Sequence, residues 1–304
     1  MNEIQQCELE QVIAAETSAA CQIVSSRPVS GGCIHETFQL KVADGRKFMI
    51  KMNRDPSAEM FQAESAGLES LAASSPLPRV PQVIAHGVLV DGHTAFLIME
   101  WIETGSRSRD FSERFGHELA TLHQSASQQP KPIDRFGFEH DNFIGSTPQL
   151  NGWRDDWAEF WRENRLRYQF HLACKNGYGE VFSSKKVELF LQRTRELIAE
   201  TAAEPPSLIH GDLWSGNYLV DEQGAPVLID PAAYYANREA EFGMTILFGG
   251  FDRRFYEAYH EAHPLQAGFQ ERFEIYKLYH LLNHLNLFGA SYLSGCASIM
   301  NRFS

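Results

Sequence analysis

The 304-residue chain has no long apolar run and an excess of acidic over basic side chains. No stretch approaches the roughly 18 uninterrupted apolar residues that a membrane-spanning helix needs, so we expect no membrane partner. Lys and Arg number 27 against 39 Asp and Glu, which gives a formal net charge of −12. This acidic balance argues against a nucleic-acid-binding protein, which would carry a basic face, and against a polybasic membrane anchor.

Cysteine is scarce and widely spaced. The five cysteines form no Cys-x-x-Cys pair; they are Cys7, Cys21, Cys33, Cys174 and Cys296. This usage fits a reducing compartment and argues against a disulfide framework. The first 20 residues carry four Glu and no Lys or Arg, the wrong charge for a signal or transit peptide. We therefore expect a soluble cytoplasmic protein, and its oligomeric state, monomer or homodimer, stays open.

The composition is that of a globular protein, with 43% hydrophobic and 12% aromatic residues. The length suggests two domains or one large two-lobed domain. Asp-Gly turns predict two hairpins in the first third of the chain, and regular apolar spacing predicts a helix between them. The expected hairpin strands are 37–42 with 47–52 and 83–90 with 94–99, and the expected helix is 57–73.

Helical periodicity dominates after residue 102. The expected helices are 111–124, 153–174, 184–200 and most of 251–304; a loop is expected over 130–151 and short strands at 208–209, 218–220 and 227–229. We therefore predict an α+β fold with a small β-rich lobe over 1–102 and a larger, mainly helical lobe over 103–304.

The most specific motif is His210-Gly-Asp-Leu-Trp-Ser-Gly-Asn217. Its Asp212, four residues and Asn217 have the spacing of a kinase catalytic loop, in which Asp is the base and Asn holds magnesium. Asp230 ends a short apolar strand 13 residues later, a suitable place for a second metal contact. Phosphoryl transfer needs these groups, because the metal neutralises phosphate oxygens while a carboxylate faces the attacking hydroxyl.

Candidate ATP-binding residues precede this motif. Gly31 and Gly32 lead into a strand, and their amides could cradle phosphates, although a Gly pair alone is a weak signal. Lys51 lies on the second strand after this pair, and Glu64 lies on the next helix, where it could orient Lys51. The segment from Glu100 to Ile102 follows an apolar strand and could offer backbone hydrogen bonds to adenine; a plain edge strand is the alternative.

These residues together make the chain similar to protein-kinase-like phosphotransferases of small molecules, and more closely to the fructosamine kinase (ketosamine-3-kinase) family. The resemblance runs from about residue 29 to 293. The core from His210 to Asn217 is shared with aminoglycoside and choline kinases. More particular to fructosamine kinases are Trp214, the segment Arg238-Glu-Ala-Glu241 and the segment Leu247-Phe-Gly-Gly-Phe251.

The resemblance implies a bilobal protein-kinase-like fold and ATP- and Mg²⁺-dependent phosphorylation of the sugar 3-hydroxyl of a ketoamine, carried on a small molecule or a protein. The unstable product would then release the amine. By position, the resemblance implies that Asp212 is the catalytic base and that Asn217 and Asp230 are magnesium ligands. Lys51, oriented by Glu64, would bind phosphates under the Gly31-Gly32 loop. Glu100 and Ile102 would contact adenine, and Trp214 would be a platform for the sugar.

Several assignments keep an alternative. Trp214 could be a core residue. His35 stands where the family more often has Ser, so a phosphate contact from a hydroxyl is in doubt there. Cys33, beside the phosphate loop, is a candidate redox-sensitive thiol or a small buried residue. We expect His280 and His284 to pack between helices, and Arg238 to be structural.

Two other functions compete with ketosamine phosphorylation. One is an aminoglycoside- or choline-type kinase of the same superfamily. The other is a catalytically dead nucleotide-binding regulator, which is disfavoured because all five of the expected catalytic groups are present: Lys51, Glu64, Asp212, Asn217 and Asp230.

Overall fold

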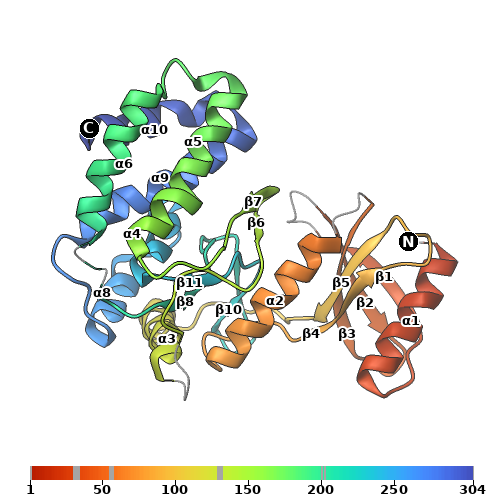
Figure 1. Ribbon diagram of the computed structural model, residues 1–304. Coiled ribbons are helices and arrows are strands. Elements are labelled where there is room, and N and C mark those ends of the chain that lie inside the picture. The colour runs from red at the N-terminus through yellow and green to blue at the C-terminus, as the bar shows by residue number, and fades with distance from the viewer. Residues whose placement is uncertain are drawn as a thin grey trace.

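The computed structural model describes residues 2–29, 35–54, 58–128, 133–199, 201 and 203–303. A sheet with two helices occupies one end of the molecule, and most of the remaining helices occupy the other (Figure 1). The fold class is α+β, as expected from the sequence.

The large sheet contains five antiparallel strands in the order β1-β2-β3-β5-β4. Their bounds are β1 Ile23–Pro28, β2 Glu36–Val42, β3 Lys47–Asn53, β4 Val83–Val88 and β5 Ala95–Glu100. The two predicted hairpins are therefore confirmed, each strand to within two residues. The hairpins adjoin one another because β3 pairs with β5, so the central strand β3 is hydrogen-bonded on both sides.

Two helices accompany this sheet: α1 (Glu3–Thr17) and α2 (Ala58–Ser74). Asn2 caps α1 in a capping box with Gln5. Leu9 and Ile13 of α1 join the buried cluster on one face of the sheet. The sequence analysis missed α1 and β1, while α2 confirms the predicted helix.

The rest of the chain forms two small hairpins, one two-stranded ladder of non-consecutive strands and a set of helices. The paired strands are β6 (Asn142–Ile144) with β7 (Thr147–Gln149), β8 (Ser207–Ile209) with β11 (Tyr234–Ala236), and β9 (Tyr218–Val220) with β10 (Pro226–Leu228). The α-helices are α3 Phe111–Ser125, α4 Trp157–Phe160, α5 Tyr168–Ala173, α6 Ser184–Ala199, α7 Phe242–Phe248, α8 Arg253–Ala262, α9 Phe269–Phe288 and α10 Leu293–Arg302. The shorter helical turns are η1 Ala126–Gln128, η2 Trp161–Arg167, η3 Cys174–Tyr178, η4 Arg238–Glu241 and η5 Ala290–Tyr292.

The helix expected over 153–174 is confirmed from residue 157 onward, and two details of this region differ from expectation. The helix predicted from residue 153 begins only at Trp157, because Asp156 caps it and Arg154 pairs instead with Phe136. The predicted loop 130–151 contains the β6–β7 hairpin, which is too short and too polar to show strand periodicity. The Trp157 and Trp161 side chains are buried in the core.

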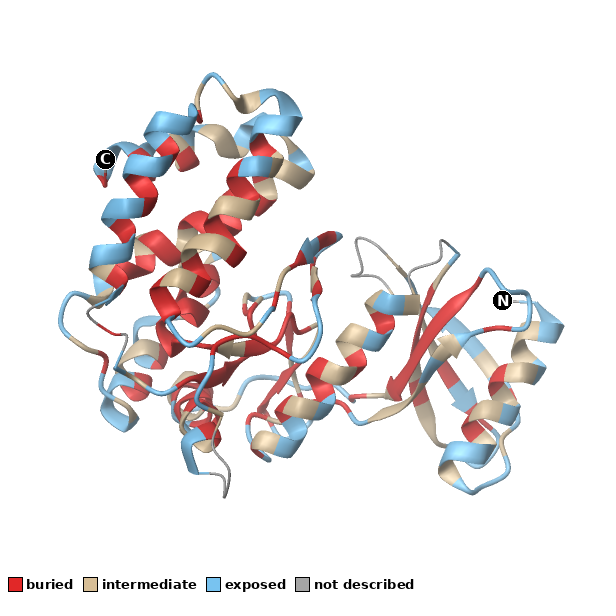
Figure 2. Ribbon diagram, viewed as in Figure 1, coloured by how far each residue is buried: buried red, intermediate tan, exposed pale blue. Residues whose placement is uncertain are grey.

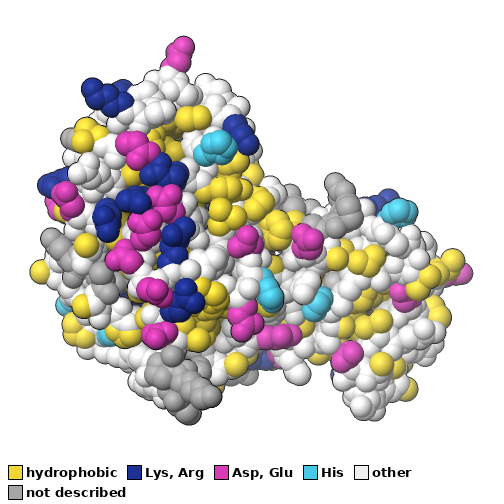
Figure 3. Space-filling view, in the orientation of Figure 1, with side chains coloured by type: hydrophobic (Ala, Val, Ile, Leu, Met, Phe, Trp, Pro, Cys, Tyr) yellow, Lys and Arg dark blue, Asp and Glu magenta, His cyan; other side chains and the backbone are white. Residues whose placement is uncertain are grey.

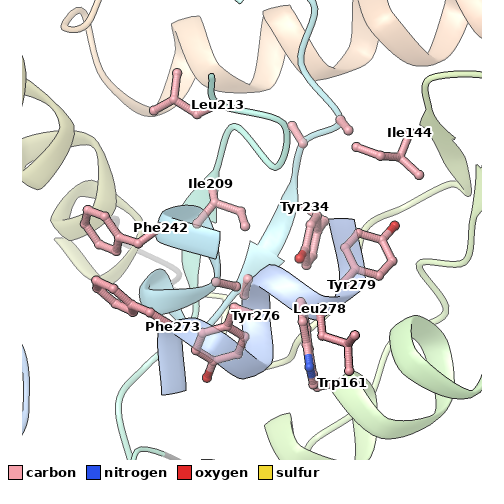
Figure 4. Packing of buried hydrophobic residues seen from close by; sticks show 14 of the residues in the cluster. Ile144, Trp161, Ile209, Leu213, Tyr234, Phe242, Phe273, Tyr276, Leu278 and Tyr279 are labelled. Atoms are coloured by element: carbon pink, nitrogen blue, oxygen red, sulfur yellow. The ribbon is translucent and has the colours of Figure 1, made fainter. Parts of the chain in front are cut away.

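The main hydrophobic core lies among the helices and the small hairpins. Aromatic side chains from α7, α9 and β11 pack there around Ile209, as Figure 4 shows. Buried residues line the inward faces of the helices and continue onto α2 and β5 (Figure 2). The core thus reaches from the helices to one face of the sheet, and the catalytic-loop candidates lie at this junction. Among the described residues, no helix is long and apolar enough to cross a membrane.

Candidate active site

Three of the predicted residues meet at one point. Lys51 Nζ on β3 lies 2.7 Å from Glu64 Oε1 on α2 and 2.6 Å from Asp230 Oδ1 beyond β10. Burial by itself lowers the pKa of Lys51, but the carboxylates of Glu64 and Asp230 outweigh it and raise the pKa above its usual value. Lys51 is therefore a buried, fixed cation, and Asp230, whose side chain is 42% exposed, still presents carboxylate surface to a ligand.

The backbone around Asp230 places this carboxylate. Asp230 has φ of +56°, a left-handed conformation that Asp tolerates better than most residues. The flanking segment is anchored on both sides, since Ile229 N–H donates to the Asn217 carbonyl at 3.0 Å and Ala232 N–H donates to the His210 carbonyl at 2.9 Å. The two predicted metal-binding segments are thus hydrogen-bonded to each other.

Asp212 and Asn217 are in direct contact. Asn217 Nδ2 donates to Asp212 Oδ2 at 3.0 Å and to the Asp212 carbonyl at 2.9 Å. Burial raises the pKa of the Asp212 carboxyl well above its usual range, and the negative charges of Asp230 and Glu241 act in the same direction, while the Asn217 hydrogen bond opposes them. Both amide hydrogens of Asn217 serve Asp212, which leaves Asn217 Oδ1 as the atom suited to a cation.

The buried side chains of Glu241 and His210 anchor the catalytic loop. The carboxylate of Glu241 accepts the backbone N–H of His210 at 2.6 Å and that of Gly211 at 3.0 Å. His210 Nδ1 accepts the Asp212 N–H at 3.3 Å, which makes Nε2 the protonated nitrogen that donates to the Ile229 carbonyl at 2.8 Å. Burial lowers the pKa of His210, so the ring is neutral and links the catalytic loop to the residue before Asp230.

From the sequence alone, Glu241 could face substrate or belong to a structural ion pair, and no anchoring role is evident. The structure buries it together with the other charged residues of the segment 238–241. Arg238 forms a bidentate pair with Glu204, and Glu239 forms one with Arg272, with the Arg272 Nε to Glu239 Oε2 distance at 2.6 Å. The expectation that Arg238 is structural agrees with its bidentate pair with Glu204. The sequence carries no local signal for the role of Glu241, because the N–H groups that it accepts belong to residues 30 and 31 positions earlier.

The β6–β7 hairpin supports the segment after Asp230 and was also missed. Gln149 Nε2 donates to the Ala232 carbonyl at 3.0 Å, and Asn142 Nδ2 donates to the Ala233 carbonyl at 2.9 Å. Tyr279 of α9 donates to Gln149 Oε1 at 2.8 Å. These buried amides satisfy carbonyls that strand pairing leaves open.

The predicted adenine contacts lie at the end of β5. The Glu100 N–H is used by the Gln82 carbonyl at 2.8 Å, and the Glu100 side chain pairs with Arg79. Only the Glu100 carbonyl therefore remains as a candidate adenine contact on that residue. The Ile102 side chain is buried just beyond the strand.

Trp214 and His35 are partly exposed residues for which the sequence left alternatives open. Trp214 is half-buried and contacts Phe248, with ring centroids 5.9 Å apart, so it is not a core residue. The His35 ring packs on Phe61 of α2, with centroids 4.8 Å apart. Burial lowers the pKa of His35, and the nearby charge of Lys51 adds to this effect. The Gly31, Gly32 and Cys33 assignments lie outside the described residues.

The donor set suits magnesium held jointly with phosphates. Mg²⁺ is commonly bound by one or two protein oxygens together with substrate phosphates, rather than by a cage of side chains. Asp230 and Asn217 provide two such oxygens on neighbouring, hydrogen-bonded segments. Within the described part of the chain, no cluster of three or more His, Cys, Asp or Glu side chains could hold a metal ion by itself.

Comparison with known proteins gives a consistent result. The profile of the family described as fructosamine kinase matches residues 5–304. A Synechocystis protein named as a ketoamine kinase is 42% identical over 93% of this chain and 92% of its own length. A chloroplastic protein-ribulosamine 3-kinase of Arabidopsis thaliana is 41% identical over 93% of this chain and 84% of its own length.

Solved structures agree on the fold. A Haemophilus somnus crystal structure named as a fructosamine-3-kinase superposes with a TM-score of 0.85 at 27% identity and covers 98% of this chain and 97% of its own. An aminoglycoside phosphotransferase solved with ADP and hygromycin B has a TM-score of 0.61 at 15% identity and covers 97% of this chain and 96% of its own. The second likeness shows the shared protein-kinase-like fold alone.

Proposed function

The chain belongs to the fructosamine kinase family, and from this membership we propose that it transfers the γ-phosphoryl group of ATP to the sugar 3-hydroxyl of a ketosamine. The substrate would be a ribulosamine or fructosamine adduct on a small molecule or a protein. Phosphorylation of such an adduct frees the amine, so the biological role we propose is repair of glycated amines. The chloroplastic relative named protein-ribulosamine 3-kinase supports a ketosugar substrate.

The observation that carries the proposal is the contact between Lys51 and Asp230. These residues are separated by 179 positions, yet their side chains meet at 2.6 Å, and Glu64 completes the cluster at 2.7 Å. A buried lysine between two carboxylates is expensive to desolvate and is weak support for stability alone. In a kinase the same set binds and aligns nucleotide phosphates, which explains why the fold maintains it.

Each charged group has a proposed role at the phosphates. Lys51 neutralises the α/β-phosphates, and Glu64 fixes the position of its ammonium group. Asp230 and Asn217 would hold Mg²⁺, which supplies positive charge against the developing charge on the phosphate oxygens. The His210 ring keeps the segments of Asn217 and Asp230 in register through its bond to the Ile229 carbonyl.

Asp212 would act on the sugar. The 3-hydroxyl attacks the γ-phosphorus, the bond from that phosphorus to ADP breaks, and the hydroxyl proton passes to the Asp212 carboxylate. The Asn217 amide orients that carboxylate, since it donates to Oδ2 at 3.0 Å. Trp214 lies two residues further along the same loop and would offer its indole face to the sugar ring.

The remaining assignments concern ATP. The carbonyl of Glu100 and the backbone amide of Ile102 would meet adenine, and the Gly31-Gly32 segment would cover the phosphates. We further propose that the chain divides into a lobe over 1–102 and a lobe over 103–304, and that the nucleotide binds between the two.

The test is turnover with defined substrates. We expect the purified chain, with ATP and Mg²⁺, to consume ATP with ribulose-lysine or fructose-lysine, and NMR to identify a 3-phosphate. Asp212→Asn should lower kcat by about 10²- to 10⁴-fold while ATP binding persists, because general-base catalysis contributes about that much. Asp155→Asn is the matched control, since the Asp155 side chain is 85% exposed and far along the chain from the loop.

Other outcomes point to the competing functions. Turnover of kanamycin or choline alone would replace ketosamine phosphorylation by that activity. ATP binding without turnover of any acceptor would favour a nucleotide-binding regulator. Near-normal kcat in Asp212→Asn would refute the proposed base.

We also keep the proposal that Cys33 makes the enzyme sensitive to oxidation. Cys7 and Cys174 are exposed free thiols, so peroxide treatment of the unaltered protein does not identify the thiol that reacts. We expect Cys33→Ser to resist reversible inactivation by peroxide, while Cys174→Ser remains sensitive. Full activity of the unaltered protein after peroxide, with no dimer on non-reducing gels, would remove the idea.

A further inference from the structure

Five aromatic side chains form a continuous row that starts on the catalytic loop. We call this set the aromatic row; it consists of Trp214, Phe248, His284, Phe288 and Tyr292. Ring centroids are 5.9 Å apart from Trp214 to Phe248, 4.8 Å from Phe248 to His284 and 5.4 Å from His284 to Phe288. Tyr292 closes the far end, 5.2 Å from His284 and 6.4 Å from Phe288. Four parts of the fold contribute: the catalytic loop, α7, α9 and η5.

The row is exposed, unlike the core rings. Phe288 is 61% exposed and Phe248 is 40% exposed, and the other three are half-buried. The nearby Tyr276 and Tyr279 of the same helix α9 are almost fully buried. Single exposed apolar residues need no explanation, but connected ones beside an active site mark a ligand surface. Figure 3 shows hydrophobic side chains gathered on the flank of the helical part that faces the sheet.

The row is also uncharged. His284 Nδ1 donates to the His280 carbonyl at 2.8 Å, so its proton is on that nitrogen. Burial lowers the pKa of His284, and the ring therefore carries no charge at neutral pH. The row contains no Lys or Arg that would pair with a carboxylate, and the chain as a whole carries −12. Aromatic faces attract a cation such as a protonated secondary amine.

We propose that the aromatic row is the carrier subsite of this enzyme and takes an aromatic or branched apolar group attached to the ketosamine nitrogen. This rests on the proposed function. A ketosamine whose sugar faces Asp212 and Trp214 has its amine and carrier directed beyond the sugar. The aromatic row begins at Trp214 and extends from there over α7, α9 and η5, so it offers an apolar surface to the carrier.

The test compares carriers on one ketosugar. Ribulosamines of phenethylamine, isoamylamine, ethanolamine and glycine differ only in the group on nitrogen. We expect kcat/KM to be about tenfold higher for phenethylamine and isoamylamine than for ethanolamine, and lowest for the carboxylate-bearing glycine adduct. Phe288→Ser and Phe248→Ser should reduce the ratio of phenethylamine to ethanolamine to within about twofold of unity.

Two variants control for folding. Phe288→Tyr keeps the ring and should keep the preference, and thermal unfolding checks that each Ser variant is folded. Leu189→Ser alters a 53% exposed apolar side chain of α6 outside the row and should keep the wild-type ratio. Equal kcat/KM for all carriers, or a preference that survives both Ser substitutions, would overturn the carrier subsite. Absence of turnover with every ketosamine would instead refute the proposed function, and the inference with it.

Discussion

Replacing Glu241 by Gln tests how the catalytic loop is held. Glu241 is 1% exposed, and its two oxygens accept the backbone N–H groups of His210 and Gly211 at 2.6 and 3.0 Å. Gln has almost the same shape, but it has one acceptor oxygen and one donor amide. One of the two N–H groups must then face another donor in a buried site.

The magnitude follows from these two hydrogen bonds. A buried N–H without an acceptor costs about 1–3 kcal/mol, and the remaining bond loses its charge assistance, which is worth about 1 kcal/mol. We therefore expect Glu241→Gln to lower the free energy of unfolding by about 2–4 kcal/mol. Relief of strain by moving the loop would displace Asp212, and a shift of about 1 Å can cost about 100-fold in rate. The KM for ATP should change little, because Lys51 and Glu64 are untouched.

Urea denaturation and steady-state kinetics measure the two effects separately. Glu257→Gln is the control, because Glu257 forms an exposed ion pair with Arg253 that contributes at most about 0.5 kcal/mol. If Glu241→Gln unfolds within about 0.5 kcal/mol of the unaltered protein and retains its kcat, the carboxylate does not hold the loop and the reasoning fails.

Three further predictions use other parts of the structure. Gly211→Ala should destroy activity and stability, because Gly211 has φ of +81° and an added Cβ would lie 2.3 Å from a carbonyl oxygen. The control is Gly92→Ala, which has φ of +69° and nothing within 4 Å of the added Cβ, so it should cost only the left-handed strain of about 1–2 kcal/mol. Equal losses of stability for the two variants by thermal unfolding would contradict this. Burial lowers the pKa of His280 to about 3, so as the pH falls His280 takes up its proton in the unfolded chain before it does so in the folded protein. The free energy of unfolding should therefore fall as the pH drops below about 6.5, by about 2 kcal/mol at pH 5 from this residue. His280→Leu should flatten that part of the urea-derived pH profile, and an unchanged slope in His280→Leu would count against it. Lys51→Met should reduce kcat/KM for ATP by about 100-fold or more, measured by ATP consumption, and a loss under about threefold would exclude a phosphate role.

Sequence reasoning worked best where local chemistry determines structure. The Asp-Gly turns predicted both hairpins of the sheet, and the spacing of Asp212, Asn217 and Asp230 predicted segments that the structure joins by hydrogen bonds. It failed where the reason for a residue lies in distant contacts. Nothing local distinguishes Glu241 as the anchor of a loop 30 residues earlier.

The β6–β7 hairpin shows the same limit. Gln149 and Asn142 look like ordinary loop residues in the sequence, yet they satisfy the carbonyls of Ala232 and Ala233 in the segment after Asp230. Their partners lie 83 and 91 positions away, so no window of local sequence contains the interaction.

By itself, the sequence determined the chemistry: an acidic chain, a lysine on a strand, and an Asp–Asn–Asp set with kinase spacing. These follow from residue identity and short-range spacing, which folding does not alter. Only the tertiary structure decided which charges meet and which rings stay exposed. Lys51 bonds Glu64 and Asp230 because β3 is central in its sheet and α2 packs over the segment after Asp230, where Gly67 lies against Pro231. The row from Trp214 to Tyr292 exists because the catalytic loop, α7, α9 and η5 converge, and convergence of distant segments is a property of packing that no local pattern contains.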